Sequence, residues 1–120
     1  METINGYSVN DKSRLQAEIE NFRRKRNTSL GVGISLSVIA IIAIIVVAAM
    51  LVNQMYEYAQ SHGSVSESEL YSVFMGPIAL IYLFSFVETA GNIIALAGGI
   101  SNHVKMANRR RTLERLRNLE

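Results

Sequence analysis

The chain has no cysteine among its 120 residues, which excludes disulfides, haem thiolates and cysteine-ligated metals. It also lacks an HExxH sequence, a phosphate-binding glycine loop and a GxSxG elbow, three patterns that place catalytic groups. Its two histidines, His62 and His103, have no other ligand types around them at metal-binding spacing. We therefore expect a protein that is not an enzyme and that holds no metal or cofactor.

Charge is missing from two long segments. Residues 30–52 are a run of 23 residues without a charge, and residues 77–100 hold Glu88 as the only charge in 24 residues. As a helix the first run would be roughly 34 Å long, which is enough to cross a hydrocarbon core of about 30 Å. A chain this small cannot cover such a helix on all sides, which argues against a soluble protein. The run also exceeds the roughly 7–15 apolar residues of a cleaved signal peptide, so we interpret it as an uncleaved anchor.

No lysine or arginine occurs between residues 30 and 100, and the twelve basic residues divide equally between the two ends of the chain. Lysine and arginine resist translocation, so we expect both termini in the cytoplasm and the integral protein in the plasma or inner membrane. The predicted fold is all-α, a two-helix transmembrane hairpin with short cytoplasmic helical extensions. Its parts are a cytoplasmic basic segment (1–29), a first span (30–52), an external acidic segment (53–76), a second span (77–100) and a cytoplasmic basic tail (101–120).

Two blocks of basic residues lie close to the predicted membrane exits. Each charge there can gain about 1 kcal/mol against anionic lipid headgroups. The blocks are also explained as topology signals alone, which is the interpretation that we favour. A nucleic-acid surface would need aromatic residues among the charges, so we expect no nucleic-acid partner. The candidate headgroup residues are Arg23, Arg24, Lys25, Arg26, Arg109, Arg110 and Arg111.

Both cytoplasmic segments have helical patterns. Ser13 and Gln16 match a capping box, which predicts a helix start at that point. Apolar residues share one face of this first helix, and leucines recur every three residues in the tail. One hypothesis is that the two faces pack together on the same side of the membrane, and the other is that the first helix lies on the lipid surface. The residues are Leu15, Ile19 and Phe22 in the first segment and Leu113, Leu116 and Leu119 in the tail.

The external segment contains the turn signals. The sequence Ser-His-Gly-Ser at residues 61–64 is the strongest turn pattern. Ser66 and Glu69 match a capping box, so we expect a short helix to begin near residue 67. Pro77 cannot donate a backbone hydrogen bond, which predicts a kink or a fresh helix start near Gly76 and Pro77.

The second span carries small and polar residues along one face. Small side chains let helices approach closely in lipid, and polar ones bond across such a contact. A charge at this depth costs about 2.5–3.5 kcal/mol, and no basic residue lies in either span to pair with Glu88. We expect a neutral Glu88 held by Ser85, Asn92 or a neighbouring copy, with a pore-lining acid as the alternative. The predicted helix-packing seam is Ser85, Glu88, Gly91, Asn92, Ala95, Gly98 and Gly99.

These features predict a small structural or accessory membrane protein that self-associates, or binds a membrane-protein partner, through the second span. The alternative is a small ion-conducting oligomer, because two spans with both ends inside and a basic tail resemble some small phage holins. A single acid in the second span is also similar to the rotor-ring subunit of rotary ATPases. That family has a glycine-dense first span and a basic cytoplasmic loop, whereas the loop here is acidic and external by charge.

Overall fold

The chain begins with a small β-hairpin. In the computed structural model, which describes residues 2–119, β1 (Thr3–Ile4) pairs antiparallel with β2 (Tyr7–Ser8), with Ile4 opposite Tyr7. The two turn residues both have positive φ angles, 53° at Asn5 and 83° at Gly6. This combination is the Asn-Gly turn that matches the twist of paired strands. Among residues 2–119, 89% of which are helical, the hairpin departs from the predicted all-α fold.

The first long helix starts directly after this hairpin. A short 3-10 turn (Val9–Asp11) leads into α1 (Lys12–His62). The Asp11 carboxylate accepts hydrogen bonds from the Ser8 backbone N–H at 2.8 Å and from the Ser8 hydroxyl at 3.1 Å. Ser13 already lies inside α1, so the predicted capping box at Ser13 and Gln16 is wrong. The Ser8–Asp11 pair, with the same three-residue spacing, organises the start of the helix instead.

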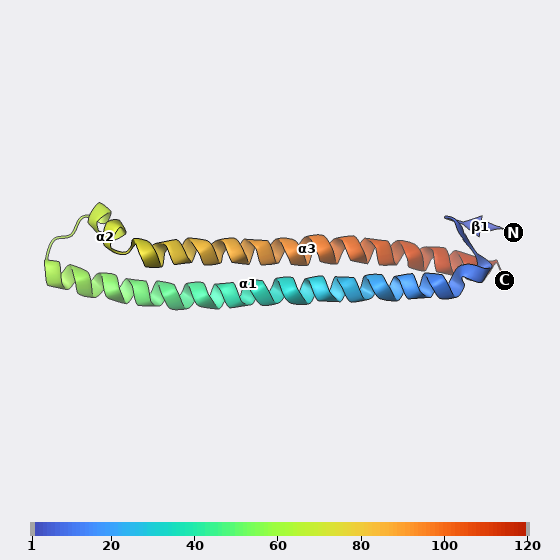
Figure 1. The fold of residues 1–120 in the computed structure, drawn as a ribbon, viewed down its shortest axis with the longest axis horizontal. Coiled ribbons are helices and arrows are strands. Elements are labelled where there is room, and N and C mark those ends of the chain that lie inside the picture. The colour runs from blue at the N-terminus through green and yellow to red at the C-terminus, as the bar shows by residue number, and fades with distance from the viewer. Residues whose placement is uncertain (1, 120) are drawn as a thin grey trace. The chain divides into compact units, whose positions relative to one another are not determined.

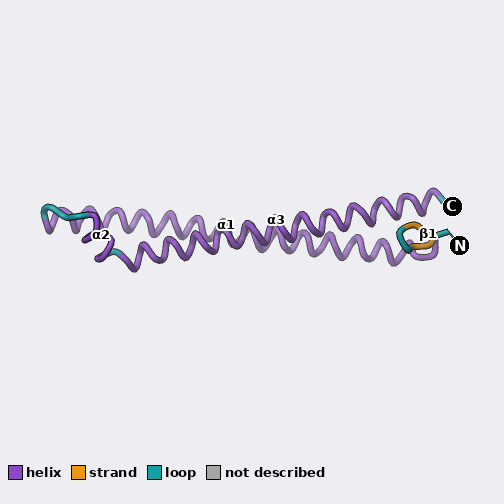
Figure 2. The backbone as a smooth tube through the Cα atoms, turned by 90° about the horizontal axis from the view of Figure 1, so that it is seen from above, coloured by secondary structure: helices purple, strands orange, loops and turns teal. Residues whose placement is uncertain are grey.

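Two further helices complete the chain. The short helix α2 covers Glu67–Val73 and the long helix α3 covers Met75–Asn118 (Figure 1). The tube in Figure 2 shows these helices as purple coils separated by short loops. The Ser66 hydroxyl accepts from the Glu69 backbone N–H at 3.2 Å, which confirms the predicted helix start. Pro77 lies in the first turn of α3, where a backbone N–H has no partner in any case, so the fresh helix start is also confirmed.

The end of α1 is set by a glycine. The helix includes His62, and Gly63 then adopts a φ of 70°, the left-handed conformation that closes many helices. The His62 ring stacks on Tyr58 with 3.9 Å between ring centroids, and its Nδ1 atom lies 2.9 Å from the Tyr58 carbonyl oxygen. The expected turn at residues 61–64 is therefore shortened to Gly63 and Ser64.

Residues 2–119 fall into two compact units. The terminal unit consists of the residues up to Gly33 and those from Ile93 onward, and the central unit is Ile34–Asn92. Helices α1 and α3 contribute to both units. Each of them contains an apolar stretch long enough to cross a membrane, with 17% of the α1 stretch and 11% of the α3 stretch buried.

The terminal unit has an apolar core. Leu15 and Leu116 are fully buried there, and Met106 is 1% exposed. Ile19 and Leu113 complete the cluster, with Phe22, Ile4 and Tyr7 packed against it. The hypothesis that the two helical faces pack together is confirmed by these contacts, whereas their location in the cytoplasm stays a prediction. Leu119 lies beyond the end of α3 at Asn118 and is exposed, so Leu113 and Leu116 are the tail leucines that face the core.

Candidate functional site

The carboxylate of Glu88 lies in a small polar cluster of the central unit. Its Oε1 atom accepts a hydrogen bond from the Asn92 amide at 2.6 Å and one from the Ser37 hydroxyl at 3.3 Å. Ser37 belongs to α1 and is 8% exposed, whereas Glu88 and Asn92 belong to α3. The cluster therefore holds the acid by hydrogen bonds within one chain, with one donor from each long helix.

The other hydroxyl groups near Glu88 have different partners. Ser85 donates to the Ile81 carbonyl at 2.8 Å, and Thr89 donates to the Ser85 carbonyl at 3.0 Å. These bonds to the preceding helical turn satisfy both hydroxyls inside α3. Of the two intrachain partners expected for Glu88, Asn92 is present and Ser85 is replaced by Ser37.

Small residues of the predicted seam lie against α1 in the terminal unit. A Cβ atom built on Gly98 would come within 2.6 Å of the Ser29 Cβ atom, and one on Gly99 within 2.9 Å of Leu30 Cδ2. At Gly98 a larger residue would have to displace α1, whereas at Gly99 it would require the Leu30 side chain to move. Ala95 is also buried, and the Asn102 amide donates to the Gly98 carbonyl at 2.7 Å.

The matching residues of α1 were missed by the sequence analysis, although a signal was present. Ser29 lies against Gly98, and Ser37 and Ala40 are buried in the central unit. Together with the buried Gly33 they repeat at spacings of three or four residues, which places them along one face of α1. The same small-residue pattern used to recognise the α3 seam thus occurs on both helices.

Some of the candidate headgroup residues form polar or ring contacts with other side chains of the protein. Arg109 binds Glu18 at 3.1 Å, and Arg23 binds Glu20 at 2.9 Å. Arg26 contacts Asn27 and His103, and Lys25 lies 5.8 Å from the centre of the Phe22 ring. Among residues 2–119, no hydrogen bond or ion pair is found for the remaining three, Arg24, Arg110 and Arg111.

The β-hairpin is attached to the helices by a polar network that the sequence analysis did not anticipate. Tyr7 donates a 2.6 Å hydrogen bond to Glu18, which also accepts from Arg109. The Arg109 guanidinium lies 5.7 Å from the centre of the Tyr7 ring, and Asn5 donates to Thr112 at 3.0 Å. The hydrogen bond to Glu18 raises the pKa of the Tyr7 hydroxyl, because it favours the protonated form. The Asn-Gly pair at residues 5–6 was the sequence signal for this hairpin.

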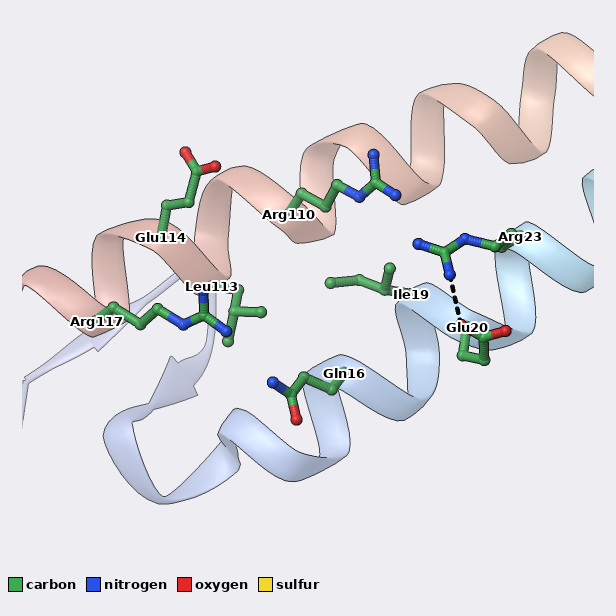
Figure 3. Close-up of a pocket in the computed structure, with 8 residues that line it drawn as sticks. All are labelled: Gln16, Ile19, Glu20, Arg23, Arg110, Leu113, Glu114 and Arg117. Carbon is green, nitrogen blue, oxygen red and sulfur yellow. Dashed lines mark hydrogen bonds and ion pairs between the residues drawn. The ribbon is translucent and has the colours of Figure 1, made fainter.

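The grooves of the two units have different linings. Figure 3 shows a groove of the terminal unit between Gln16, Glu20 and Arg23 of α1 and Arg110, Glu114 and Arg117 of α3, a mixture of both charges. In the central unit a groove of about 490 Å³ lies among mostly apolar side chains from all three helices. Its lining residues are Leu51, Met55, Glu67, Leu70, Tyr71, Ile78, Ile81, Tyr82 and Ser85.

No group of three or more His, Cys, Asp or Glu side chains suited to a metal ion occurs within residues 2–119. The expected lack of a metal, a cofactor and enzymatic activity stays a prediction. Comparisons with protein-family models, with curated proteins and with solved structures find no match to this chain.

Proposed function

We propose that the chain is a small integral membrane protein, a transmembrane helical hairpin that serves as a structural or accessory subunit and has no catalytic role. The observation that carries this proposal is the exposure of large apolar side chains on both long helices. Ile39 is 65% exposed, Val52 is 66% exposed and Leu96 is 61% exposed. Exposed apolar residues of this number favour aggregation in water, whereas they are normal on a helix that faces lipid.

The low burial of the two apolar stretches supports the same proposal. A core helix of a soluble protein is mostly covered by its neighbours, whereas these stretches are 17% and 11% buried. In water, each Å² of exposed apolar surface would cost about 25 cal/mol of free energy relative to burial. Lipid tails remove that cost without any further protein.

The charge distribution supports an orientation with both termini in the cytoplasm. All twelve basic residues lie at the two ends, outside residues 30–100, and the intervening loop carries only acids. The core of Leu15, Met106 and Leu116 then belongs to a small cytoplasmic module, where burial from water stabilises it.

The Glu88 cluster favours the structural role over the pore-lining alternative. The carboxylate is engaged by Ser37 and Asn92, and no pore or neighbouring copy is needed to hold it. The closest approaches of the α3 seam are also made to the same chain, at Ser29 and Leu30. Association with a second copy or with another membrane protein is accordingly proposed for the outward surfaces of α3, which include Phe86 and Ile93, 74% and 60% exposed.

Fractionation and single-cysteine labelling test this proposal, and the absence of native cysteine gives a clean background. The protein should stay in the membrane pellet after alkaline carbonate extraction. On intact cells, a membrane-impermeant maleimide should label Ser64→Cys and should leave Ser13→Cys and Asn118→Cys unlabelled until the cells are opened. Release by carbonate, or labelling of the two terminal cysteines on intact cells, would contradict the proposal.

A further inference from the structure

A groove of about 370 Å³ in the terminal unit changes from polar to apolar along its length. Arg26, Asn27 and His103 line one part, and Leu30, Ala95 and Gly99 belong to the other. The polar residues flank the predicted spans and the apolar ones lie within them. The groove therefore has the same gradient as a phospholipid, with a headgroup beside an acyl chain.

The polar part of the groove presents hydrogen-bond donors. The Arg26 Nε and Nη2 atoms donate to the Asn27 side-chain oxygen at 3.3 and 3.2 Å, and Nη1 lies 3.2 Å from His103 Nδ1. A guanidinium has five N–H groups and only donates, so two N–H groups of Arg26 remain. Because a guanidinium can only donate, His103 Nδ1 is the acceptor in this contact and Nε2 carries the ring proton.

Asn27 adds to the same set of donors. Its side-chain oxygen accepts from Arg26, and its amide group has two further N–H donors on this exposed side chain. None of the residues that line this groove is acidic, whereas the groove of Figure 3 contains Glu20 and Glu114. One permanent positive charge surrounded by donors is complementary to a phosphate, because charge-assisted hydrogen bonds to phosphate are the strong ones.

The apolar part of the groove is a strip formed by both long helices. Leu30 of α1 and the exposed Leu96 and Ile100 of α3 line this part, and the small Ala95 and Gly99 lie buried between them. A strip of this kind accommodates a linear acyl chain through dispersion contacts. An inorganic phosphate would occupy the polar part and leave the strip uncovered.

We propose that this groove binds one anionic phospholipid, with the phosphate at Arg26, Asn27 and His103 and an acyl chain along Leu30, Leu96 and Ile100. The proposal rests on the membrane location proposed above and names the lipid class that this surface selects. It gives a lipid-binding role to Arg26, a residue of the basic block before the first span that is otherwise explained as a topology signal.

The test uses the full-length protein, purified in a neutral detergent from washed membranes. Native mass spectrometry measures retention of phosphatidylglycerol and of phosphatidylcholine with identical chains. Phosphatidylglycerol should bind several-fold more tightly, and Arg26→Gln should weaken its binding about fivefold, the loss expected for one arginine at an anionic lipid surface. The matched control is Arg24→Gln, which removes the same charge from the same helix outside this groove and should change binding by less than about twofold.

A second variant and two soluble probes complete the experiment. His103→Gln alters an exposed side chain, keeps the helix and should also weaken phosphatidylglycerol binding, while far-UV circular dichroism checks that each variant is folded. Inorganic phosphate and glycerophosphoglycerol should fail to displace the lipid, because neither has an acyl chain.

Three results would overturn the proposal. Equal losses for Arg24→Gln and Arg26→Gln would mean diffuse charge attraction, and equal retention of the two lipids would mean no anion selectivity. Displacement by phosphate alone would mean a phosphate site without a lipid role. Failure of the membrane proposal has a different signature, since the protein would then be missing from the washed membranes.

Discussion

The terminal and central units distribute their side chains in opposite ways. The core of the terminal unit is made of large apolar residues, with Leu15 and Leu116 fully buried and Met106 1% exposed, whereas Ile93 and Leu96 of the same unit, inside the predicted second span, are exposed. In the central unit several buried positions hold small residues, such as Ser37 and Ala40, while Ile45 is 62% exposed. The same two helices contribute to both units, so the contrast comes from the sequence and not from the type of fold.

This contrast is the one expected if the core of the terminal unit faces water and the central unit faces lipid. In water, burying large apolar side chains is the main stabilising term. In lipid that term is missing between helices, and association depends on close packing of small residues and on hydrogen bonds. The Leu and Met core of the terminal unit fits the first situation, and the Ser37–Glu88–Asn92 cluster fits the second.

The largest effect should come from emptying the terminal core. Leu116→Ala removes a fully buried side chain and should destabilise the terminal unit by about 2–5 kcal/mol. Ile45→Ala removes a similar side chain from an exposed position of the central unit and should change stability by less than about 0.5 kcal/mol in detergent. Hydrogen exchange of the amides in each unit measures both effects, and equal responses would contradict the proposed contrast.

A crowded glycine should be the next most sensitive position. Gly98→Ile places a branched side chain against Ser29 and should cost about 1–3 kcal/mol, because α1 and α3 must separate there. Gly31→Ile is the matched control, since a Cβ atom at Gly31 meets nothing within 4 Å. Thermal unfolding in detergent, followed by circular dichroism, compares the two. An equal fall of the unfolding midpoint in both variants would contradict close packing of α3 against α1 at Gly98.

The polar cluster should respond more weakly. Glu88→Gln keeps the shape and a hydrogen-bonding side chain, so stability should change by less than about 0.5 kcal/mol. Ser37→Ala removes one hydrogen bond between α1 and α3 and should cost about 0.6 kcal/mol, the average for such bonds in membrane proteins. Unfolding in detergent measures the stability, and ion flux in liposomes supplies the second readout. Flux in the wild type that disappears in Glu88→Gln would favour the pore interpretation.

The smallest effect concerns the hydroxyl of Tyr7. Its pKa is raised by the hydrogen bond to Glu18, so the bond stabilises the terminal unit below the ordinary tyrosine value near 10. That contribution should be lost as the pH rises through the higher pKa of the folded state. Tyr7→Phe should cost about 0.5 kcal/mol at neutral pH, because the pair is partly exposed. The difference in ultraviolet absorbance between wild type and Tyr7→Phe should titrate above pH 10, and a midpoint at or below 10 would contradict this geometry.

Much of the fold follows from periodic patterns in the sequence. The apolar runs predict the two long helices, and Ser66 with Glu69 predicts the start of α2. The β-hairpin was missed because two-residue strands have no periodicity, and only the Asn5-Gly6 turn identifies it. The Ser13 cap was wrong because Ser8 and Asp11 present the same spacing closer to the hairpin.

The sequence predicted the residues of the candidate site on α3 but not their partners on α1. A helical wheel places Glu88, Gly91 and Ala95 on one face of α3, but it cannot say which helix meets that face. The contacts with Ser29 and Ser37 depend on the register between two helices, which a single sequence does not determine. Small residues on α1 at the same spacing were the available signal.

Site-directed spin labelling tests the two-solvent account most directly. A label at Ile45→Cys should relax strongly with molecular oxygen, which concentrates in lipid, and weakly with a water-soluble nickel complex. A label at Arg110→Cys, exposed on the terminal unit, should show the reverse order. The account predicts this exchange of order between the two positions in liposomes. Strong relaxation of the Ile45→Cys label by the nickel complex would contradict it.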